Sequence, residues 1–97
     1  MIVSFRDRGT GDIFNGRSTQ AARRTCPQTI WMVAQRKLDL LDSATTLGDL
    51  RIPPGNRLER LTGSRNGEHS IRINDQYRIC FEWTDAGPNE VEIDDYH

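Results

Sequence analysis

The sequence of 97 residues has few of the residues on which several classes of protein depend. Its two histidines, His69 and His97, are too few for a zinc site, and its two cysteines lie far apart, at residues 26 and 80. No apolar run approaches the roughly 20 residues that a membrane-spanning helix requires. No glycine-rich phosphate loop and no internal repeat is present. We therefore expect one domain over residues 1–97 that uses no metal, cofactor or membrane segment.

The small number of cysteines and the short apolar segment at the N-terminus also predict where in the cell the protein is found. The apolar part of residues 1–6 is too short for a secretory signal, and isolated thiols are typical of reducing compartments. We expect a cytoplasmic protein whose cysteines are reduced and structural.

Lysine is almost absent: of the 13 basic residues, 12 are arginines. The formal net charge is −1, but residues 79–97 hold six acidic residues and no basic ones, which leaves all 13 basic and eight of the 14 acidic residues in the first 78. Arginine offers a planar set of donors that suits phosphate groups and stacks on bases. A solvated surface has the same composition, so the position of the arginines has to decide between the two interpretations.

A helix is predicted over residues 27–43. Pro27 suits a first turn, and apolar residues recur at three- and four-residue spacing. This buried stripe consists of Ile30, Trp31, Ala34, Leu38 and Leu41. The segment before Pro27 is polar and weakly patterned. We expect in addition a strand over residues 2–5, a short helix over residues 10–14 and a turn of helix over residues 46–50.

From residue 57 onwards the apolar residues recur with a period of two, which is typical of strands. The predicted strands cover residues 57–61, 68–74, 77–84 and 89–94. Helices followed by strands that are joined by hairpins predict an α+β domain, in which N-terminal helices pack on one face of an antiparallel sheet.

The other face of this sheet is predicted to be basic. Alternation places Arg72 and Arg78 on neighbouring strands, opposite the apolar residues. The preceding strand and its loop bring three more arginines, which are Arg57, Arg60 and Arg65. The sequence Asp-Tyr-His at residues 95–97 follows the last strand. We expect these arginines to cover this face of the sheet, with the ionisable residues 95–97 at its edge.

Three stretches carry motifs that are specific in combination. They are residues 54–63 (PGNRLERLTG), 69–81 (HSIRINDQYRICF) and 91–97 (VEIDDYH). Residues 2–5, 37–38 and 41–45 extend the likeness over nearly the whole chain. In these stretches the chain resembles the HigB toxins of type II toxin–antitoxin systems, which belong to the RelE superfamily, and it looks most similar to their GraT-like branch.

The resemblance implies a fold, an activity and partners. Toxins of this family are α+β domains similar to microbial ribonucleases, with helices on a curved antiparallel sheet whose concave side meets RNA. They are endoribonucleases that enter the ribosomal A site and cut mRNA during translation. A HigA-type helix-turn-helix antitoxin silences each toxin and represses the shared operon, so the toxin reaches operon DNA only through the antitoxin complex.

RNA cleavage without a metal needs a base for the 2′-hydroxyl, cations for the phosphate and an acid for the leaving 5′-oxygen. The resemblance assigns the acid or base to His97, the active-site carboxylate to Asp95 and the sheet arginine to Arg78. An imidazole ordinarily titrates nearer to neutral pH than other side chains, which suits His97 to this role. Asp95 is expected to orient His97 or an arginine, and Arg78 is expected to clamp the phosphate. Tyr96 either stacks on a base, orients the phosphate or caps the core.

The general base stays open. In the HigB pattern a histidine often follows the leucine of the strand at residues 57–61, and a lysine follows in the turn; here these positions hold Glu59 and Thr62. Glu59 is either a replacement base, as in microbial ribonucleases that use glutamate with histidine, or a solvated residue. The arginines expected to bind RNA are Arg57, Arg60, Arg65 and Arg72.

His69 falls outside the family's catalytic pattern, and we expect it to be a structural or edge histidine. Two other functions remain possible. One is a non-catalytic inhibitor that occupies the ribosome or RNA, and the other is a catalytically weak partner kept only to bind an antitoxin.

Overall fold

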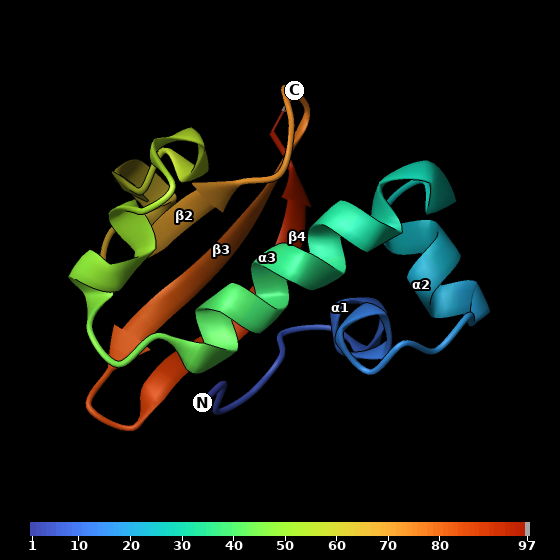
Figure 1. The fold of residues 1–97 in the computed structure, drawn as a ribbon, viewed down its shortest axis with the longest axis horizontal. Coiled ribbons are helices and arrows are strands. Elements are labelled where there is room, and N and C mark those ends of the chain that lie inside the picture. Colours follow the sequence, from blue (N-terminus) through green and yellow to red (C-terminus); the bar gives the residue numbers. More distant parts are fainter. Residues whose placement is uncertain (97) are drawn as a thin grey trace.

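The computed structural model describes residues 1–96, which form two layers: helices cover one face of a four-stranded antiparallel sheet (Figure 1). The strands follow one another in the order β1-β2-β3-β4, so each strand pairs with its neighbour in the sequence. They are β1 (Glu59–Arg60), β2 (His69–Arg72), β3 (Tyr77–Thr84) and β4 (Gly87–Asp95). This arrangement confirms the α+β prediction.

The helices precede the sheet in the sequence. They are α1 (Arg8–Phe14), α2 (Gln20–Thr25) and α3 (Trp31–Ser43), with 3-10 turns η1 (Gln28–Ile30), η2 (Leu47–Arg51), η3 (Pro54–Asn56) and η4 (Gly63–Arg65). Figure 1 shows α3 lying across the sheet, with α1 and α2 beside it. The predicted helix over residues 27–43 is therefore η1 followed by α3, because the backbone of Ile30 leaves the helical region between them.

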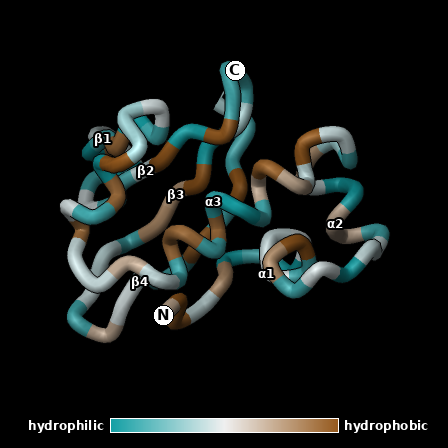
Figure 2. The backbone as a smooth tube through the Cα atoms, in the orientation of Figure 1, coloured by the Kyte–Doolittle hydropathy of each residue, from teal (hydrophilic) through white to brown (hydrophobic). Residues whose placement is uncertain are grey.

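The core lies between α3 and the sheet. Ala34, Leu38 and Leu41 of α3 are fully buried, as the stripe predicts, and they share one cluster with buried residues of β2, β3 and β4. Those of the strand residues that are both large and fully buried are Ile71, Ile79, Phe81 and Val91. Figure 2 shows the hydrophobic residues recurring along α3 and along the strands beneath it. The period-two alternation thus identifies the core face correctly.

The sequence analysis missed α2. Its start is fixed by Thr19, whose hydroxyl accepts a hydrogen bond from the amide of Ala22 at 3.1 Å and donates to a carboxylate oxygen of Asp12 at 2.6 Å. Threonine at an N-cap is the local signal that was available. The contact with Asp12 in α1 is tertiary, and a six-residue helix depends on such contacts because it is too short to be stable alone.

The strand predicted over residues 2–5 is wrong. This segment runs beside β4 and exchanges backbone hydrogen bonds with it, but only Phe5 and Val91 form a bridge. The reason lies at Glu90, which has a left-handed backbone (φ 53°) and donates its amide to the Ser4 hydroxyl at 3.0 Å. A side chain therefore takes the place of a backbone acceptor, and no regular ladder forms.

The strand predicted over residues 57–61 is shorter than expected. Arg57 has a left-handed backbone (φ 46°) at the end of η3, which excludes it from the strand. Only Glu59 and Arg60 pair with β2, opposite Ser70 and His69.

The segment that leads into β1 is held by a buried asparagine. Asn56 is fully buried, and its side-chain amide donates to the carbonyl oxygens of Leu50 at 3.1 Å and Ile52 at 3.3 Å. Its side-chain oxygen accepts a hydrogen bond from the ammonium group of Lys37 on α3. These contacts fix the segment to the helical layer and so determine where Arg57 lies.

We expect Asn56→Ala to lower the free energy of unfolding by about 2–3 kcal/mol, because the carbonyl groups of Leu50 and Ile52 and the Lys37 ammonium lose their partner. Urea unfolding followed by the fluorescence of Trp31 and Trp83 measures this change. Asn66→Ala, in an exposed loop, is the control and should change stability by less than about 0.5 kcal/mol. Equal effects of the two substitutions would contradict the assignment.

Candidate functional site

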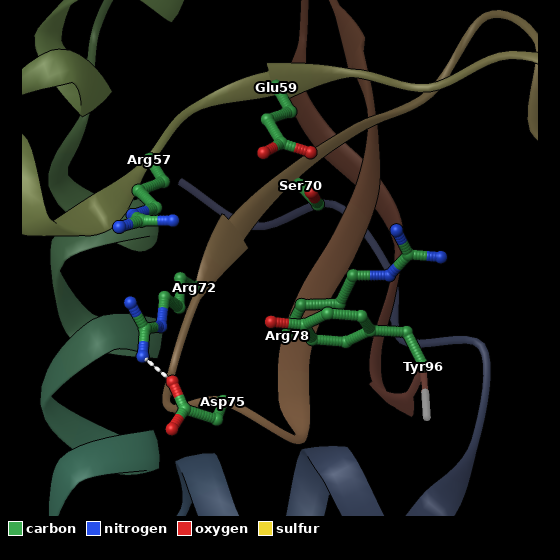
Figure 3. Close-up of a pocket in the computed structure, with 7 residues that line it drawn as sticks. All are labelled: Arg57, Glu59, Ser70, Arg72, Asp75, Arg78 and Tyr96. Carbon is green, nitrogen blue, oxygen red and sulfur yellow. Dashed lines mark hydrogen bonds and ion pairs between the residues drawn. The ribbon is translucent and has the colours of Figure 1, made fainter.

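A pocket of about 300 Å³ opens on the sheet face that lies away from the core (Figure 3). Its lining residues are Arg57, Glu59, Ser70, Arg72, Asp75, Arg78 and Tyr96. Register explains the convergence, since Glu59 lies opposite Ser70 and Arg72 lies opposite Arg78. Side chains of directly opposed residues project from the same face of a sheet. Three neighbouring strands therefore contribute to one space.

Arg78 is held from two directions. Its Nε donates to a carboxylate oxygen of Asp94 on β4 at 3.1 Å. The ring of Tyr96 covers the guanidinium, with 5.0 Å between Cζ and the ring centroid, which is a cation–π distance. These two contacts restrict the Arg78 side chain more than the one ion pair with an exposed partner restricts Arg72.

Tyr96 itself is fastened to the β2–β3 hairpin. Its hydroxyl donates to the carbonyl oxygen of Asn74 at 3.2 Å, and its backbone amide donates to that of Gln76 at 3.1 Å. The residue is 42% exposed and contacts Arg78, so it does not cap the core. Stacking on a base and orienting the phosphate stay predictions for Tyr96.

The acidic residue that orients Arg78 is Asp94, which the sequence analysis missed. Asp94 lies directly opposite Arg78 in the β3–β4 register, and that register was the signal that could have identified it. Asp95 lies opposite Tyr77, so alternation directs it to the other face, where its carboxylate accepts a hydrogen bond from Gln76 at 3.0 Å. Asp94 is therefore the carboxylate that contacts Arg78, and the orienting role expected of Asp95 stays a prediction.

His97 lies outside the described residues. Its predicted role as acid or base, and its orientation by Asp95, stay predictions.

The arginines expected to bind RNA occupy different surroundings. Arg57 is exposed at the rim of the pocket, and Arg72 forms an ion pair with Asp75 at the hairpin tip (Figure 3). Arg60 and Arg65 line an adjoining pocket of about 410 Å³, which shares Glu59 and Arg78 with the first. The structure thus brings Arg57, Arg72 and Arg78 together and sets Arg60 and Arg65 beside them.

Arg65 is engaged by three carboxylates. Its guanidinium lies 3.1 Å from Glu68 and 3.5 Å from Asp94, and it forms a close ion pair with Glu92. Burial lowers the pKa of Arg65, but the hydrogen bond to Glu92 and the nearby negative charges outweigh burial and raise that pKa above its ordinary value. Arg65 thereby holds η4 against β4, and its predicted contact with RNA would compete with these ion pairs.

Arg6 extends the same network from the N-terminal segment. It lies 3.6 Å from Glu68 and 3.4 Å from both Glu90 and Glu92. The network joins arginines of the first 78 residues to acidic residues of the last 19. The opposite charges that the sequence separates therefore lie next to each other in the folded chain.

His69 lies on the core face, opposite Phe81 in the β2–β3 register. Its ring stacks on Phe81 with 6.3 Å between centroids, and its Nδ1 is buried without a hydrogen-bond partner among residues 1–96. Burial, together with the charge of Arg60, lowers the pKa of His69 below its ordinary value.

Other kinds of site have less support in the described part of the chain. Among residues 1–96, no three or more His, Cys, Asp or Glu side chains are arranged to hold a metal ion. Cys26 and Cys80 are buried, and burial raises the pKa of each thiol to about 11. None of the helices described is long and apolar enough to cross a bilayer.

Three guanidinium groups, two carboxylates and one aromatic hydroxyl therefore share the pocket. Guanidinium groups bind phosphate through paired donors, and an exposed carboxylate can accept a proton. The arrangement suits a phosphodiester that is held in place while a nearby hydroxyl loses its proton.

We expect the stability of the protein to fall as the pH falls below about 6.5, in part because of His69. The unfolded chain takes up a proton on this histidine near pH 6.5, whereas the folded chain takes it up only at lower pH, so protonation favours unfolding. Urea midpoints at pH 7.0 and 5.5 measure the effect. His69→Gln should show a smaller difference between the two midpoints than the unchanged protein, and an equal difference would contradict this account.

Comparison with known sequences supplies independent information. Residues 3–97 match a family model described as the RelE-like toxin of the type II toxin–antitoxin system HigB. The chain is 41% identical over 86 residues to Toxin HigB-1 of Vibrio cholerae, and the aligned segment covers 89% of this chain and 87% of that protein. It is 37% identical over 68 residues to an uncharacterised protein of Haemophilus influenzae, and the aligned segment covers 70% of this chain and 67% of that protein.

Proposed function

We propose, because this chain belongs to the HigB family of RelE-like toxins from type II toxin–antitoxin systems, that it is a metal-independent endoribonuclease that cuts mRNA on the ribosome during translation. The observation that carries the proposal is the pocket on the uncovered sheet face, where Glu59 and Tyr96 lie with three arginines. Family membership supports the toxin class, and the pocket supports the chemistry.

In the proposed reaction the arginines bind the scissile phosphate. The Nε of Arg78 is occupied by Asp94, so its terminal Nη groups are the donors that can reach the phosphate. Arg72 lies opposite in the register, and its partner Asp75 is 91% exposed. Exposed ion pairs contribute at most about 1 kcal/mol, so Arg72 can exchange Asp75 for a phosphate at little cost. Two guanidinium groups then stabilise the charge that develops on the phosphate oxygens.

Glu59 is the proposed base. It is exposed on the edge strand β1, within the same pocket as Arg72 and Arg78. Its carboxylate takes the proton of the ribose 2′-hydroxyl, whose oxygen attacks the phosphorus and displaces the 5′-oxygen. The products are a 2′,3′-cyclic phosphate and a 5′-hydroxyl end, the latter after protonation by an acid. The family resemblance gives the role of the acid to His97.

The proposed partners follow from the family. A HigA-type helix-turn-helix antitoxin would silence the toxin in the cytoplasm and connect it to operon DNA. The ribosomal A site would supply the mRNA in a cleavable conformation.

A second candidate function is inhibition by occupancy, without cleavage. Glu59 and Thr62 stand where the HigB pattern often has a histidine and a lysine, which removes two groups suited to proton transfer and charge stabilisation. A toxin that binds the ribosome but cleaves weakly, or is retained to bind its antitoxin, would show this pattern.

Arg78→Ala should reduce mRNA cleavage by about 100-fold or more, because it removes the ordered cation that faces the phosphate. Primer extension on transcripts after brief induction measures cleavage, and co-sedimentation with ribosomes measures binding. Arg36→Ala, an exposed arginine of α3, is the matched control and should cleave normally. Growth inhibition that survives both Arg78→Ala and His97→Ala would show that the toxin acts by occupancy.

Asp94→Asn should lower the single-turnover cleavage rate by about tenfold and leave ribosome binding nearly unchanged. The substitution removes the charge that anchors Nε of Arg78, so the guanidinium is less well positioned. Glu82→Gln, which changes an exposed carboxylate on β3, is the control. Unchanged cleavage by Asp94→Asn, with the cleavage of Glu82→Gln also unchanged, would rule out a positioning role for Asp94.

A further inference from the structure

We infer that α1, α2 and the loop between them carry a second surface that binds the phosphate backbone of RNA, separate from the candidate site. Four exposed arginines define this surface, which we call the α1–α2 surface: Arg8, Arg17, Arg23 and Arg24. Three of them, Arg8, Arg17 and Arg24, line one pocket of about 450 Å³. Arg23 precedes Arg24 in the last turn of α2.

The α1–α2 surface is remote from the candidate site in the architecture. The candidate site lies over β1, β2 and β3, whereas α1 contacts β4 and α3, and α2 packs on α1 (Figure 1). None of the four arginines lines the pocket that holds Arg78.

The acidic residues of this region serve the local fold. A carboxylate oxygen of Asp7 accepts the amide of Thr10 at 2.7 Å and so caps α1. Asp12 is 7% exposed, and its carboxylate accepts the hydroxyl of Thr19 at the start of α2. Both carboxylates are thus used to begin helices, and the arginines around them keep their charge exposed.

The contrast with the sheet face is informative. There Arg6, Arg65, Arg72 and Arg78 each form an ion pair with a carboxylate, whereas Arg57 and Arg60 form none within residues 1–96. Within the described part of the chain, no ion pair involves an arginine of the α1–α2 surface. A phosphate that binds this surface therefore displaces only water and counterions, and four like charges in one region create the positive potential that attracts a polyanion.

The composition of the pocket favours RNA over a protein. Its lining combines the three arginines with Asp12, Thr19 and Gln20, and holds no aromatic or large apolar side chain. The central part of a protein interface is rich in such apolar side chains. Contacts to a nucleic-acid backbone need only arginine and small polar donors, which this surface supplies.

The test is an RNA that can be bound but not cut. We suggest a fluorescein-labelled RNA hairpin with 2′-O-methyl groups throughout, because without a 2′-hydroxyl no cleavage takes place. Fluorescence anisotropy over a series of KCl concentrations gives the affinity and its salt dependence. Arg17→Gln combined with Arg24→Gln should weaken binding at low salt by about tenfold or more, and should reduce the slope of log K against log[KCl] by about 2.

A matched pair controls for the general loss of two positive charges. Arg36→Gln combined with Arg51→Gln removes two exposed arginines, of α3 and η2, from outside the α1–α2 surface. A weaker effect of this pair supports the inference, and equal effects of the two pairs overturn it.

Normal hairpin binding by the Arg17→Gln/Arg24→Gln variant, together with loss of neutralisation by the antitoxin, would identify the surface as a protein-binding one and also overturn the inference. Since the hairpin cannot be cleaved, each result is independent of whether the candidate site is catalytic.

Discussion

The ion pairs of Arg65 are the interaction on which the uncovered face of the sheet depends. They join η4, which follows β1, to Glu92 and Asp94 on β4, and so connect the two ends of the strand order. Asp94 shares its carboxylate between Arg65 and Arg78, and Glu92 shares its own between Arg65 and Arg6. The position of Arg78 is therefore coupled to the N-terminal segment through two carboxylates. A charge count near zero conceals this arrangement, because the charges that cancel are distant in the sequence and adjacent in space.

The parts of the fold that follow from local periodicity could be predicted from the sequence. The stripe of α3 and the alternation along β3 each depend on spacing within one element, and both identify the core face. The misses have a different cause. The helix α2 depends on Thr19 reaching Asp12 in α1, and residues 2–5 fail to form a strand because Ser4 takes the amide of Glu90, 86 residues later. Thr19 as an N-cap was a local signal for α2, but the contacts that decide both segments are made with residues outside them, and periodicity within one segment does not reveal such contacts.

The candidate site divides in the same way. Alternation sufficed to place Arg72 and Arg78 on one face, and the hairpin register then makes them direct partners. Alternation could not show that the β3–β4 register brings Asp94 rather than Asp95 to Arg78, since a shift of one residue exchanges the two faces. Nor could it show that Arg65 is surrounded by carboxylates, because the path of the loop after β1 decides that.

Arg72 and Arg78 face each other across two strands, yet they differ in freedom. Arg78 lies between Asp94 and the ring of Tyr96, whereas Arg72 has a partner, Asp75, that is almost entirely in solvent. An arginine side chain that becomes immobile loses about 2 kcal/mol of conformational entropy at room temperature. For Arg78 most of this loss occurs when the chain folds, so an incoming anion meets a fixed donor. For Arg72 the loss of conformational entropy occurs when the anion binds. The Arg72 side chain can therefore adjust its position to anions of different shape.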